Sequence, residues 1–266
     1  MPDISFPNLG IELYNVSRTA FSVFGVSIYW YALMLTGGIF AGYGTALIEA
    51  KRTKQKTDDY SELFFFGVIA SIIGSRLFYA AFRWENFSDN PLRIITGIRD
   101  GGLSVFGGIL GGIIAAYTIS RVRKMDFVTI LDTCAPSFAI GQAIGRWGNF
   151  FNREAFGSFT DNLFAMRIAQ GAEYIQVHPT FFYESMWSLA AFAALTAYRP
   201  HKRFTGEVFW LYLVSYGFVR FFIEILRTDP LLLGTLQVSQ AMAFIFFVSG
   251  IAVIALQRRR LRQNVK

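Results

Sequence analysis

Long stretches without charge constrain this chain more than any other feature of its sequence. Phe24–Ile48, Gly101–Ser120 and Leu231–Leu256 contain no Asp, Glu, Lys or Arg. A helix of about 20 such residues crosses the roughly 30 Å hydrocarbon core of a bilayer. Because lipid cannot satisfy backbone hydrogen bonds, these segments are predicted to be helices.

Four further stretches are nearly as apolar but carry a few ionisable residues: Ser61–Phe82, Phe127–Gly145, Pro179–Tyr198 and Gly206–Leu226. Together the segments predict an all-α, polytopic membrane bundle of about seven transmembrane helices, forming one domain over residues 1–266. Charged residues make up 16% of the chain, well below the roughly 25% of soluble domains. The first span is too long for a signal-peptide core, so we expect no cleavage.

The basic residues are unequally divided between the two sides that seven spans define. Fifteen of the 25 Lys and Arg residues fall in connections on one side, and seven fall on the other. The positive-inside rule makes the richer side cytoplasmic, with the N-terminus outside the cell and the C-terminus in the cytoplasm. Topology thus explains the net charge of +7, and we expect no nucleic acid as a partner.

Ionisable residues inside a membrane cost about 3 kcal/mol or more at its centre, so they usually mark function. The predicted topology places most of the polar candidates toward the outer surface: Tyr31, Arg76, Arg146, Glu184, Arg220 and Glu224. Only Asp132 falls in the inner half. Arg220 and Glu224 could instead form a self-contained pair, and Arg76 could extend to the interface. The shared depth favours a polar cavity for an anionic phospholipid, since guanidinium groups match phosphate geometry.

The connection over residues 146–178 is the longest internal loop, and we predict that it is extracytoplasmic. Its beginning, residues 145–157, reads Gly-Arg-Trp-Gly-Asn-Phe-Phe-Asn-Arg-Glu-Ala-Phe-Gly. Asn149, Asn152 and Glu154 supply hydrogen-bonding groups beside Arg146, and the glycines permit tight turns. Composition alone would also allow a structural cap on the fourth helix.

This segment resembles the signature of the bacterial prolipoprotein diacylglyceryl transferases, G-R-x-G-N-F-x-N-x-E-x-x-G, and every fixed position is present. Supporting motifs occur in order along nearly the whole chain: Ser27–Met34, Gly74–Leu77, Gly101–Gly108, His178–Glu184 and Arg220–Arg227. The resemblance implies an enzyme of the bacterial cytoplasmic membrane. It implies transfer of the diacylglyceryl group of phosphatidylglycerol to the lipobox cysteine thiol of a preprolipoprotein, with a thioether and glycerol phosphate as products.

The resemblance also implies roles for particular residues. The catalytic candidates are Arg146, Arg220, Glu154 and Glu224. The substrate-binding candidates are Arg146, Asn149, Tyr31, Asn152, Gly157, Arg76 and Arg227. We expect no cofactor and no metal, because no His, Cys or carboxylate cluster has metal-ligand spacing. The single Cys134 is expected to pack within a span, and the glycine pairs beginning at Gly107 are expected to pack helices closely.

Phe106 departs from the family pattern, because many members carry at this position a histidine considered as the base. Phe106 cannot take the proton of the acceptor thiol, so the base stays open between Glu154, Glu224 and the field of the arginines. His178 is expected to fix the entry of the fifth span together with Pro179. Two other function classes stay open, a non-catalytic lipid-binding scaffold and a lipid transporter, although no internal repeat supports the transporter.

Overall fold

The computed structural model describes residues 2–97, 101–170, 173–228, 232–234 and 236–264. Residues 98–100 and 171–172 of two predicted outer connections, residues 231 and 235 of the last predicted span, and the tail residues 265–266 lie outside this description. The chain divides into two compact units. The larger unit is Met1–Thr45 with Cys134–Lys266, and the smaller unit is Ala46–Thr133.

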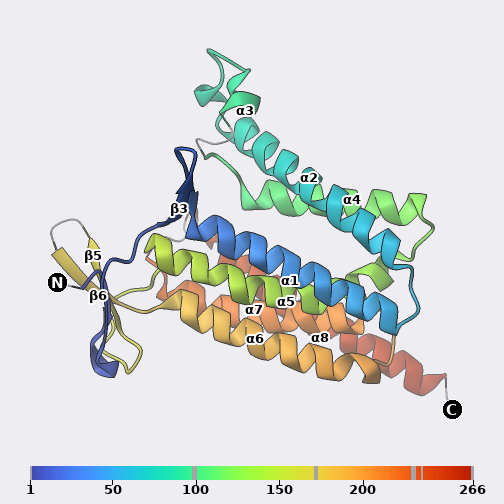
Figure 1. The fold of residues 1–266 in the computed structure, drawn as a ribbon. Coiled ribbons are helices and arrows are strands. Elements are labelled where there is room, and N and C mark those ends of the chain that lie inside the picture. Colours follow the sequence, from blue (N-terminus) through green and yellow to red (C-terminus); the bar gives the residue numbers. More distant parts are fainter. Residues whose placement is uncertain (1, 98–100, 171–172, 229–231, 235, 265–266) are drawn as a thin grey trace. The chain divides into compact units, whose positions relative to one another are not determined.

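Helices dominate both units (Figure 1). The long ones are α1 (Trp30–Arg52), α2 (Thr57–Phe82), α4 (Val105–Val122), α5 (Phe127–Asn152), α6 (Thr180–Tyr198), α7 (Glu207–Leu226) and α8 (Val238–Gln263). The short ones are α3 (Arg93–Thr96) and the 3-10 turns η1 (Pro7–Leu9), η2 (Trp84–Asn86) and η4 (Arg199–His201). All the long helices except α6 are long and apolar enough to cross a membrane, six in the part of the chain that the structure describes. This confirms a multi-pass membrane fold, whereas α6 as a seventh span stays a prediction.

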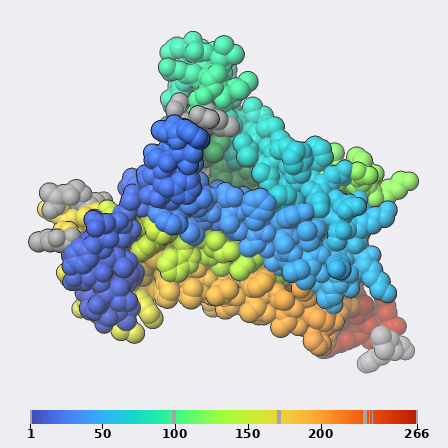
Figure 2. Space-filling view, in the orientation of Figure 1, coloured from blue at the N-terminus to red at the C-terminus, as the bar shows by residue number. Residues whose placement is uncertain are grey.

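Large apolar side chains lie on the surface of these helices. Examples that are at least 45% exposed are Leu35, Phe40, Ile72, Ile113, Leu189 and Phe222. Apolar surface of this extent is unusual for a soluble monomer and is stable against hydrocarbon. We therefore infer that much of the helix surface visible in Figure 2 faces lipid.

Two helix ends differ from the predicted ones. The first helix begins at Trp30 rather than Phe24, because the preceding residues form an antiparallel hairpin of β3 (Thr19–Val23) and β4 (Val26–Tyr29). Helix α5 continues to Asn152, so the first residues of the predicted 146–178 loop are helical. The chain turns only afterwards, where Arg153 and Ala155 adopt positive φ values of 53° and 55°.

The all-α prediction missed a four-stranded antiparallel sheet in the larger unit. Its strands are β1 (Ile4–Phe6), β2 (Ile11–Leu13), β5 (Met166–Gln170) and β6 (Glu173–Val177), in the order β2-β1-β5-β6. A separate pair joins β7 (Leu232–Leu233) and β8 (Leu236–Gln237). Ile4 and Ile168 pair across the sheet and pack, with Val177, against Phe150 of α5 and Phe181 of α6. The sheet therefore sits where α5 ends and α6 begins, as Figure 1 shows.

Glycines let the helices of the larger unit approach closely. A Cβ atom on Gly38 of α1 would lie 2.7 Å from the carbonyl oxygen of Gly141 on α5. A Cβ atom on Gly217 of α7 would lie 2.5 Å from the carbonyl oxygen of Ala243 on α8. Such small residues allow the van der Waals contact that holds membrane helices together. Helices α5, α6 and α7 also share a buried apolar cluster: Ala135, Ala139, Leu195, Val208 and Tyr212.

In the smaller unit, α2 and α4 pack through glycines in the same way. A Cβ atom on Gly107 would lie 2.2 Å from the carbonyl oxygen of Gly74, and one on Gly111 would lie 2.2 Å from that of Ala70. A side chain at either position would push the two helices apart. The prediction that this glycine series packs helices is therefore confirmed.

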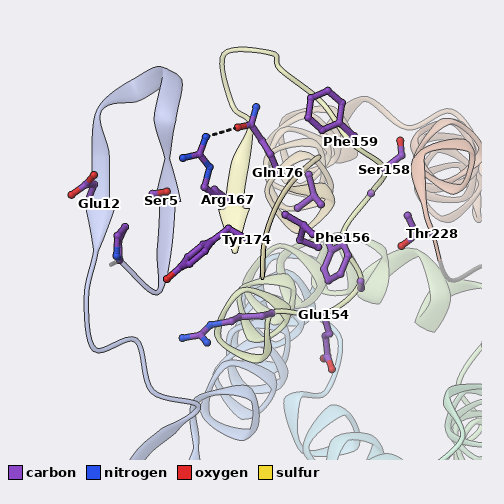
Figure 3. A pocket seen from close by; sticks show the side chains of 16 residues that line it. Ser5, Glu12, Glu154, Phe156, Ser158, Phe159, Arg167, Tyr174, Gln176 and Thr228 are labelled. Carbon is purple, nitrogen blue, oxygen red and sulfur yellow. Dashed lines mark hydrogen bonds between the residues drawn. The ribbon is translucent and has the colours of Figure 1, made fainter. Parts of the chain in front are cut away.

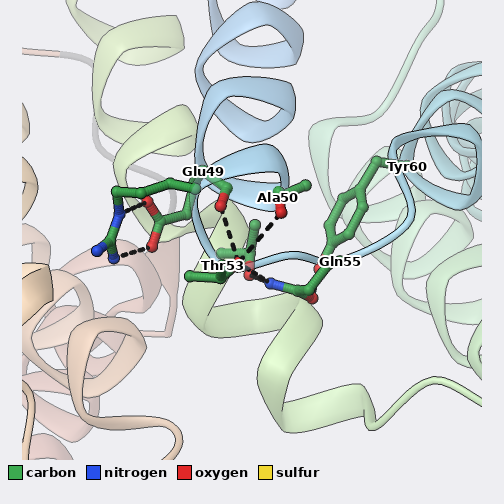
Figure 4. A network of polar contacts seen from close by, with 7 residues as sticks. Glu49, Ala50, Thr53, Gln55 and Tyr60 are labelled. Atoms are coloured by element: carbon green, nitrogen blue, oxygen red, sulfur yellow. Dashed lines mark hydrogen bonds and ion pairs between the residues drawn. The ribbon is translucent and has the colours of Figure 1, made fainter.

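A polar network closes the connection between α1 and α2 (Figure 4). The Gln55 side chain donates to Thr53 Oγ1 at 2.6 Å and accepts from the Tyr60 hydroxyl at 2.5 Å. Thr53 Oγ1 in turn donates to the carbonyl oxygens of Glu49 and Ala50 at 2.8 and 3.3 Å. These carbonyls belong to the last turns of α1, where helical partners run out. The network therefore fixes the turn that returns the chain into α2.

Candidate functional site

Four charged side chains from three helices form a continuous series of ion pairs, named here the ion-pair tetrad: Arg146 of α5, Glu184 of α6, and Arg220 and Glu224 of α7. Arg146 Nη2 pairs with Glu184 Oε2. Glu184 Oε1 accepts from Arg220 Nη1 at 3.1 Å, and Arg220 Nη2 lies 2.7 Å from Glu224 Oε2. The two oxygens of one carboxylate therefore hold both arginines.

The tetrad carries no net charge and is mostly buried. Glu184, Arg220 and Glu224 are 5%, 9% and 1% exposed, whereas the side chain of Arg146 is 24% exposed. Buried charges persist when they are paired, because desolvation costs several kcal/mol per ion. Among the described residues, Glu184 is the only ion-pair partner of Arg146. Most of the five guanidinium donors of Arg146 therefore stay available at the exposed end of the tetrad.

Contacts between α5 and α6 fix the first pair of the tetrad. The indole Nε1 of Trp147 donates to Ser185 Oγ at 3.1 Å, and Ser185 Oγ donates to the carbonyl oxygen of Ala143 at 2.7 Å. Trp147 follows Arg146 in the sequence, and Ser185 follows Glu184. The two hydrogen bonds therefore hold the neighbouring charged side chains in register across the helix interface.

Arg220 and Glu224 lie one turn apart on α7, where side chains four residues apart are neighbours. The structure confirms the contact between them. The pair is not self-contained, however, because Arg220 also contacts Glu184. Sequence reasoning placed Glu184 among the outer polar residues but gave it no role in the site. The sequence signal that could have identified Glu184 as a site residue was an acidic side chain inside an apolar segment.

Glu154 is the centre of a second polar cluster, directly after α5 ends. Glu154 Oε1 accepts from Asn149 Nδ2 at 3.0 Å and from Asn152 Nδ2 at 3.1 Å. The structure thus brings together three of the signature side chains that the sequence singled out. Arg146 lies three residues before Asn149 and therefore on the same face of α5. The C-terminal end of α5 therefore carries Arg146 of the tetrad and the two asparagines that bind Glu154.

Gly157 is enclosed by two neighbouring segments. Its backbone N–H donates to the carbonyl oxygen of His178 at 2.9 Å, and its backbone forms a bridge with Arg227. A Cβ atom on Gly157 would lie 2.8 Å from His178 Cβ and 3.0 Å from the carbonyl oxygen of Leu226. Only glycine fits here without displacement. Burial lowers the pKa of His178.

Tyr31 lies in the first turn of α1 and packs on the signature helix. A Cβ atom on Gly148 of α5 would lie 2.7 Å from Tyr31 Cδ2, so the absence of a side chain at Gly148 makes room for the ring. Tyr31 remains 38% exposed. Its position beside α5 is compatible with the predicted substrate-binding role, which stays a prediction.

Arg76 lies in the smaller unit, and backbone carbonyls surround its guanidinium group. Nη1 donates to Gly101 and Gly102, Nη2 donates to Arg93, and Nε donates to Ile94, at distances from 2.6 to 3.1 Å. These bonds fasten the connection between α2 and α4. They favour a structural role over the phosphate contact that the sequence predicted for Arg76.

Phe106 on α4 packs near Phe78, with 6.5 Å between the ring centroids. A phenyl ring cannot accept a proton, so Glu154, Glu224 and the field of the arginines stay the alternatives. Glu154 is exposed, whereas Glu224 is 1% exposed and paired with Arg220. The structure therefore favours Glu154. No group of three His, Cys, Asp or Glu side chains within the described ranges could hold a metal ion.

The sequence profile of the family described as prolipoprotein diacylglyceryl transferase matches residues 18–256. A phosphatidylglycerol–prolipoprotein diacylglyceryl transferase of Clostridium novyi is 39% identical over 257 residues, which cover 94% of this chain and 97% of the relative. Proteins of the same name from Finegoldia magna and Enterococcus faecalis are 37% and 39% identical, with 94% and 93% of this chain covered and 98% and 92% of the relatives. The matched residues include the tetrad and the Glu154 cluster. The chain therefore belongs to the prolipoprotein diacylglyceryl transferase family.

Proposed function

We propose that this protein transfers the diacylglyceryl group of phosphatidylglycerol to the thiol of a lipobox cysteine in a preprolipoprotein, the first step of bacterial lipoprotein maturation. The observation that carries the proposal is the ion-pair tetrad, in which Glu184 holds Arg146 and Arg220 together. The name shared by relatives that are 37–39% identical over most of the chain supports the same activity.

Arg146 offers the donors that a phosphodiester needs. Its side chain is 24% exposed, and a guanidinium fork stays charged and matches phosphate oxygens in geometry. Arg220 lies behind it and binds the other oxygen of Glu184, so it helps to fix the carboxylate that holds Arg146. We assign head-group binding to Asn149 on α5 and to Tyr31 on α1, which packs against α5.

In the reaction, the acceptor sulfur attacks the glyceryl carbon that carries the phosphate oxygen. A C–S bond forms while the C–O bond breaks, and glycerol phosphate leaves with the electron pair of that bond. The negative charge on the phosphate grows during this step. Arginines that are already fixed in place stabilise the growing charge, and removing one such donor typically costs roughly 100- to 1000-fold in rate.

Glu154 is the base that the geometry favours. A thiol with a pKa of about 8.5 is mostly protonated at neutral pH and needs to lose its proton before it can attack. Glu154 is exposed and is oriented by Asn149 and Asn152. Glu224, buried beside Arg220, contributes instead by positioning that arginine.

The protein is expected to span the bacterial cytoplasmic membrane seven times, with α6 as the additional span and the N-terminus outside. The unequal distribution of Lys and Arg supports this orientation. Cysteine labelling tests it in a Cys134→Ala background. Ser158→Cys should react with an impermeant maleimide added outside intact cells, and Lys54→Cys should react only after the membrane is opened. The reverse pattern would contradict the orientation.

A defined assay tests the activity itself. Purified protein is incubated with phosphatidylglycerol vesicles and a lipobox peptide that contains one cysteine, and the peptide is analysed by mass spectrometry. Thioether-linked diacylglyceryl peptide and an equal amount of glycerol phosphate would support the transferase. Bound lipid without product would instead indicate a scaffold, and lipid movement without product would indicate a transporter.

A further inference from the structure

The polar face of the four-stranded sheet lines a groove of about 1240 Å³. This face and the segment 153–159, with Thr228, form its two sides, and we name it the sheet groove (Figure 3). The polar and aromatic lining residues on the strands are Ser5, Glu12, Arg167, Tyr174 and Gln176, and the apolar residues Ile175 and Val177 of β6 also line the groove. The groove lies within the larger unit and is separate from the tetrad, none of whose residues line it.

Strand register explains why polar side chains gather in the sheet groove. Ser5 of β1 pairs with Glu12 of β2 and with Arg167 of β5, and Arg167 pairs with Gln176 of β6. These four residues form one row across the sheet, and Arg167 Nη2 donates to Gln176 Oε1 at 3.2 Å. Because side chains alternate along a strand, the neighbouring apolar residues face the opposite side and pack against the helix ends.

The groove leads to the candidate site. Its opposite side includes Glu154, whose carboxylate accepts from Asn149 and Asn152 in the last turns of α5. Arg146 precedes Asn152 by six residues, or ~9 Å along the helix axis at 1.5 Å per residue. A ligand that fills the groove and reaches Glu154 therefore ends close to the residues assigned to the lipid phosphate.

The lining excludes several classes of ligand. The lining is mixed, with Phe156, Phe159, Ile175 and Val177 beside the charged Glu12 and Arg167. An acyl chain alone would match the apolar part but would leave the two charged side chains against hydrocarbon, which is costly. A simple anion would be bound by positive charge alone, whereas the groove carries both Glu12 and Arg167. The volume exceeds the roughly 300–1,000 Å³ of pockets for drug-sized ligands. Amide, guanidinium and carboxylate groups beside the Tyr174 ring suit an extended polypeptide, whose backbone and side chains offer donors and acceptors in series.

We infer that the sheet groove binds the acceptor polypeptide, along the polar segment that follows the acceptor cysteine on the aqueous side. This inference rests on the proposed function, which requires a polypeptide acceptor. Binding there would deliver the cysteine to Glu154 while the lipid occupies the tetrad. The groove would thus select the protein substrate separately from the lipid.

A binding measurement tests the groove without requiring turnover. The probe is a fluorescent lipobox peptide with eight polar residues after the acceptor position and serine in place of the cysteine, titrated onto protein in phosphatidylglycerol nanodiscs. Arg167→Glu and Glu12→Lys should each weaken binding about tenfold, the loss expected when a hydrogen bond to a charged group is removed. Glu173→Gln is the matched control, because Glu173 is exposed on the same sheet but does not line the groove.

A second probe, truncated directly after the acceptor position, should bind all four proteins with similar affinity. Thermal unfolding of each variant separates loss of binding from loss of folding, and the two variants on different strands serve as independent tests. If both folded variants bind the long peptide with wild-type affinity, the inference that the sheet groove binds the acceptor polypeptide is wrong. The two proposals can also fail separately. If the wild-type protein binds the long peptide but makes no thioether from the same peptide with cysteine at the acceptor position, the groove stays supported and the proposed activity is refuted.

Discussion

Glu184→Gln is the substitution that separates the tetrad from an ordinary structural ion pair. It keeps the size of the side chain and one oxygen acceptor but removes the charge that Arg146 and Arg220 share. The tetrad then changes from neutral to a net charge of one positive. Arg220 retains Glu224, whereas Arg146 loses its only ion-pair partner among the described residues. We therefore expect the main structural consequence at Arg146.

The magnitude follows from the geometry. Two unit charges about 4 Å apart interact by about 4 kcal/mol at an effective dielectric constant of about 20. Arg146 is 24% exposed, so water compensates part of the loss, and we expect destabilisation of about 1–3 kcal/mol. Transfer activity should fall further, by roughly 100-fold, because the guanidinium no longer has a fixed position when the phosphate charge grows.

A double-mutant cycle distinguishes the two effects. In Arg146→Gln/Glu184→Gln the remaining pair, Arg220 with Glu224, is again neutral. The double variant should therefore be destabilised by about 0.5–3 kcal/mol less than the sum of the two single destabilisations. Its activity should nevertheless stay as low as that of the single variants, because Arg146 is absent. Melting curves in detergent and initial rates of thioether formation provide the two readings. Wild-type rates for Glu184→Gln would refute the reasoning.

Three further predictions concern packing and pH. Gly157→Ala should destabilise the protein by about 1–3 kcal/mol, since its Cβ would lie 2.8 Å from His178 Cβ. Gly44→Ala is the control: a Cβ there has nothing within 4 Å, so the melting temperature should not fall. Gly107→Ala should lower the melting temperature through the contact of α2 with α4, whereas Gly67→Ala should not, and equal effects would contradict this packing. The pKa of His178 is lowered by burial, so its contribution to stability is full above about pH 6.5 and is lost as the pH falls through the folded value. Between pH 7 and pH 5 the melting temperature should therefore drop more for the wild type than for His178→Gln.

The sequence predicted the elements whose signal is local. Charge-free runs of about 20 residues identify membrane helices because the bilayer imposes their length. The spacing of Arg220 and Glu224 allowed a contact between them as one alternative, and the structure shows that contact. The glycines at Gly107 and Gly111 likewise indicated close helix packing before any partner was known. The signature singled out Asn149, Asn152 and Glu154 as hydrogen-bonding groups, and the structure shows that both amides bind the Glu154 carboxylate.

Features that depend on distant partners could not be predicted in this way. Strand β1 has three residues and pairs with β5 more than 160 positions later, as in Ile4 with Ile168, so neither segment carries a strand signal of useful length. Glu184 was recognisable as an acidic residue in an apolar run, but its two arginine partners come from α5 and α7. The carbonyls that surround Arg76 come from a connection without a regular pattern. Long-range geometry, rather than residue type, decided these roles.

The central claim is that Arg146, held in place through Glu184 and Arg220, binds the lipid phosphate while the acceptor sulfur displaces it. The most direct test is the initial rate of thioether formation by Arg146→Gln and Arg220→Gln in protein that remains folded, with the exposed Arg18→Gln as a matched control. We predict a loss of roughly 100-fold or more for each tetrad variant and a wild-type rate for the control. Wild-type rates for both Arg146→Gln and Arg220→Gln would contradict the account.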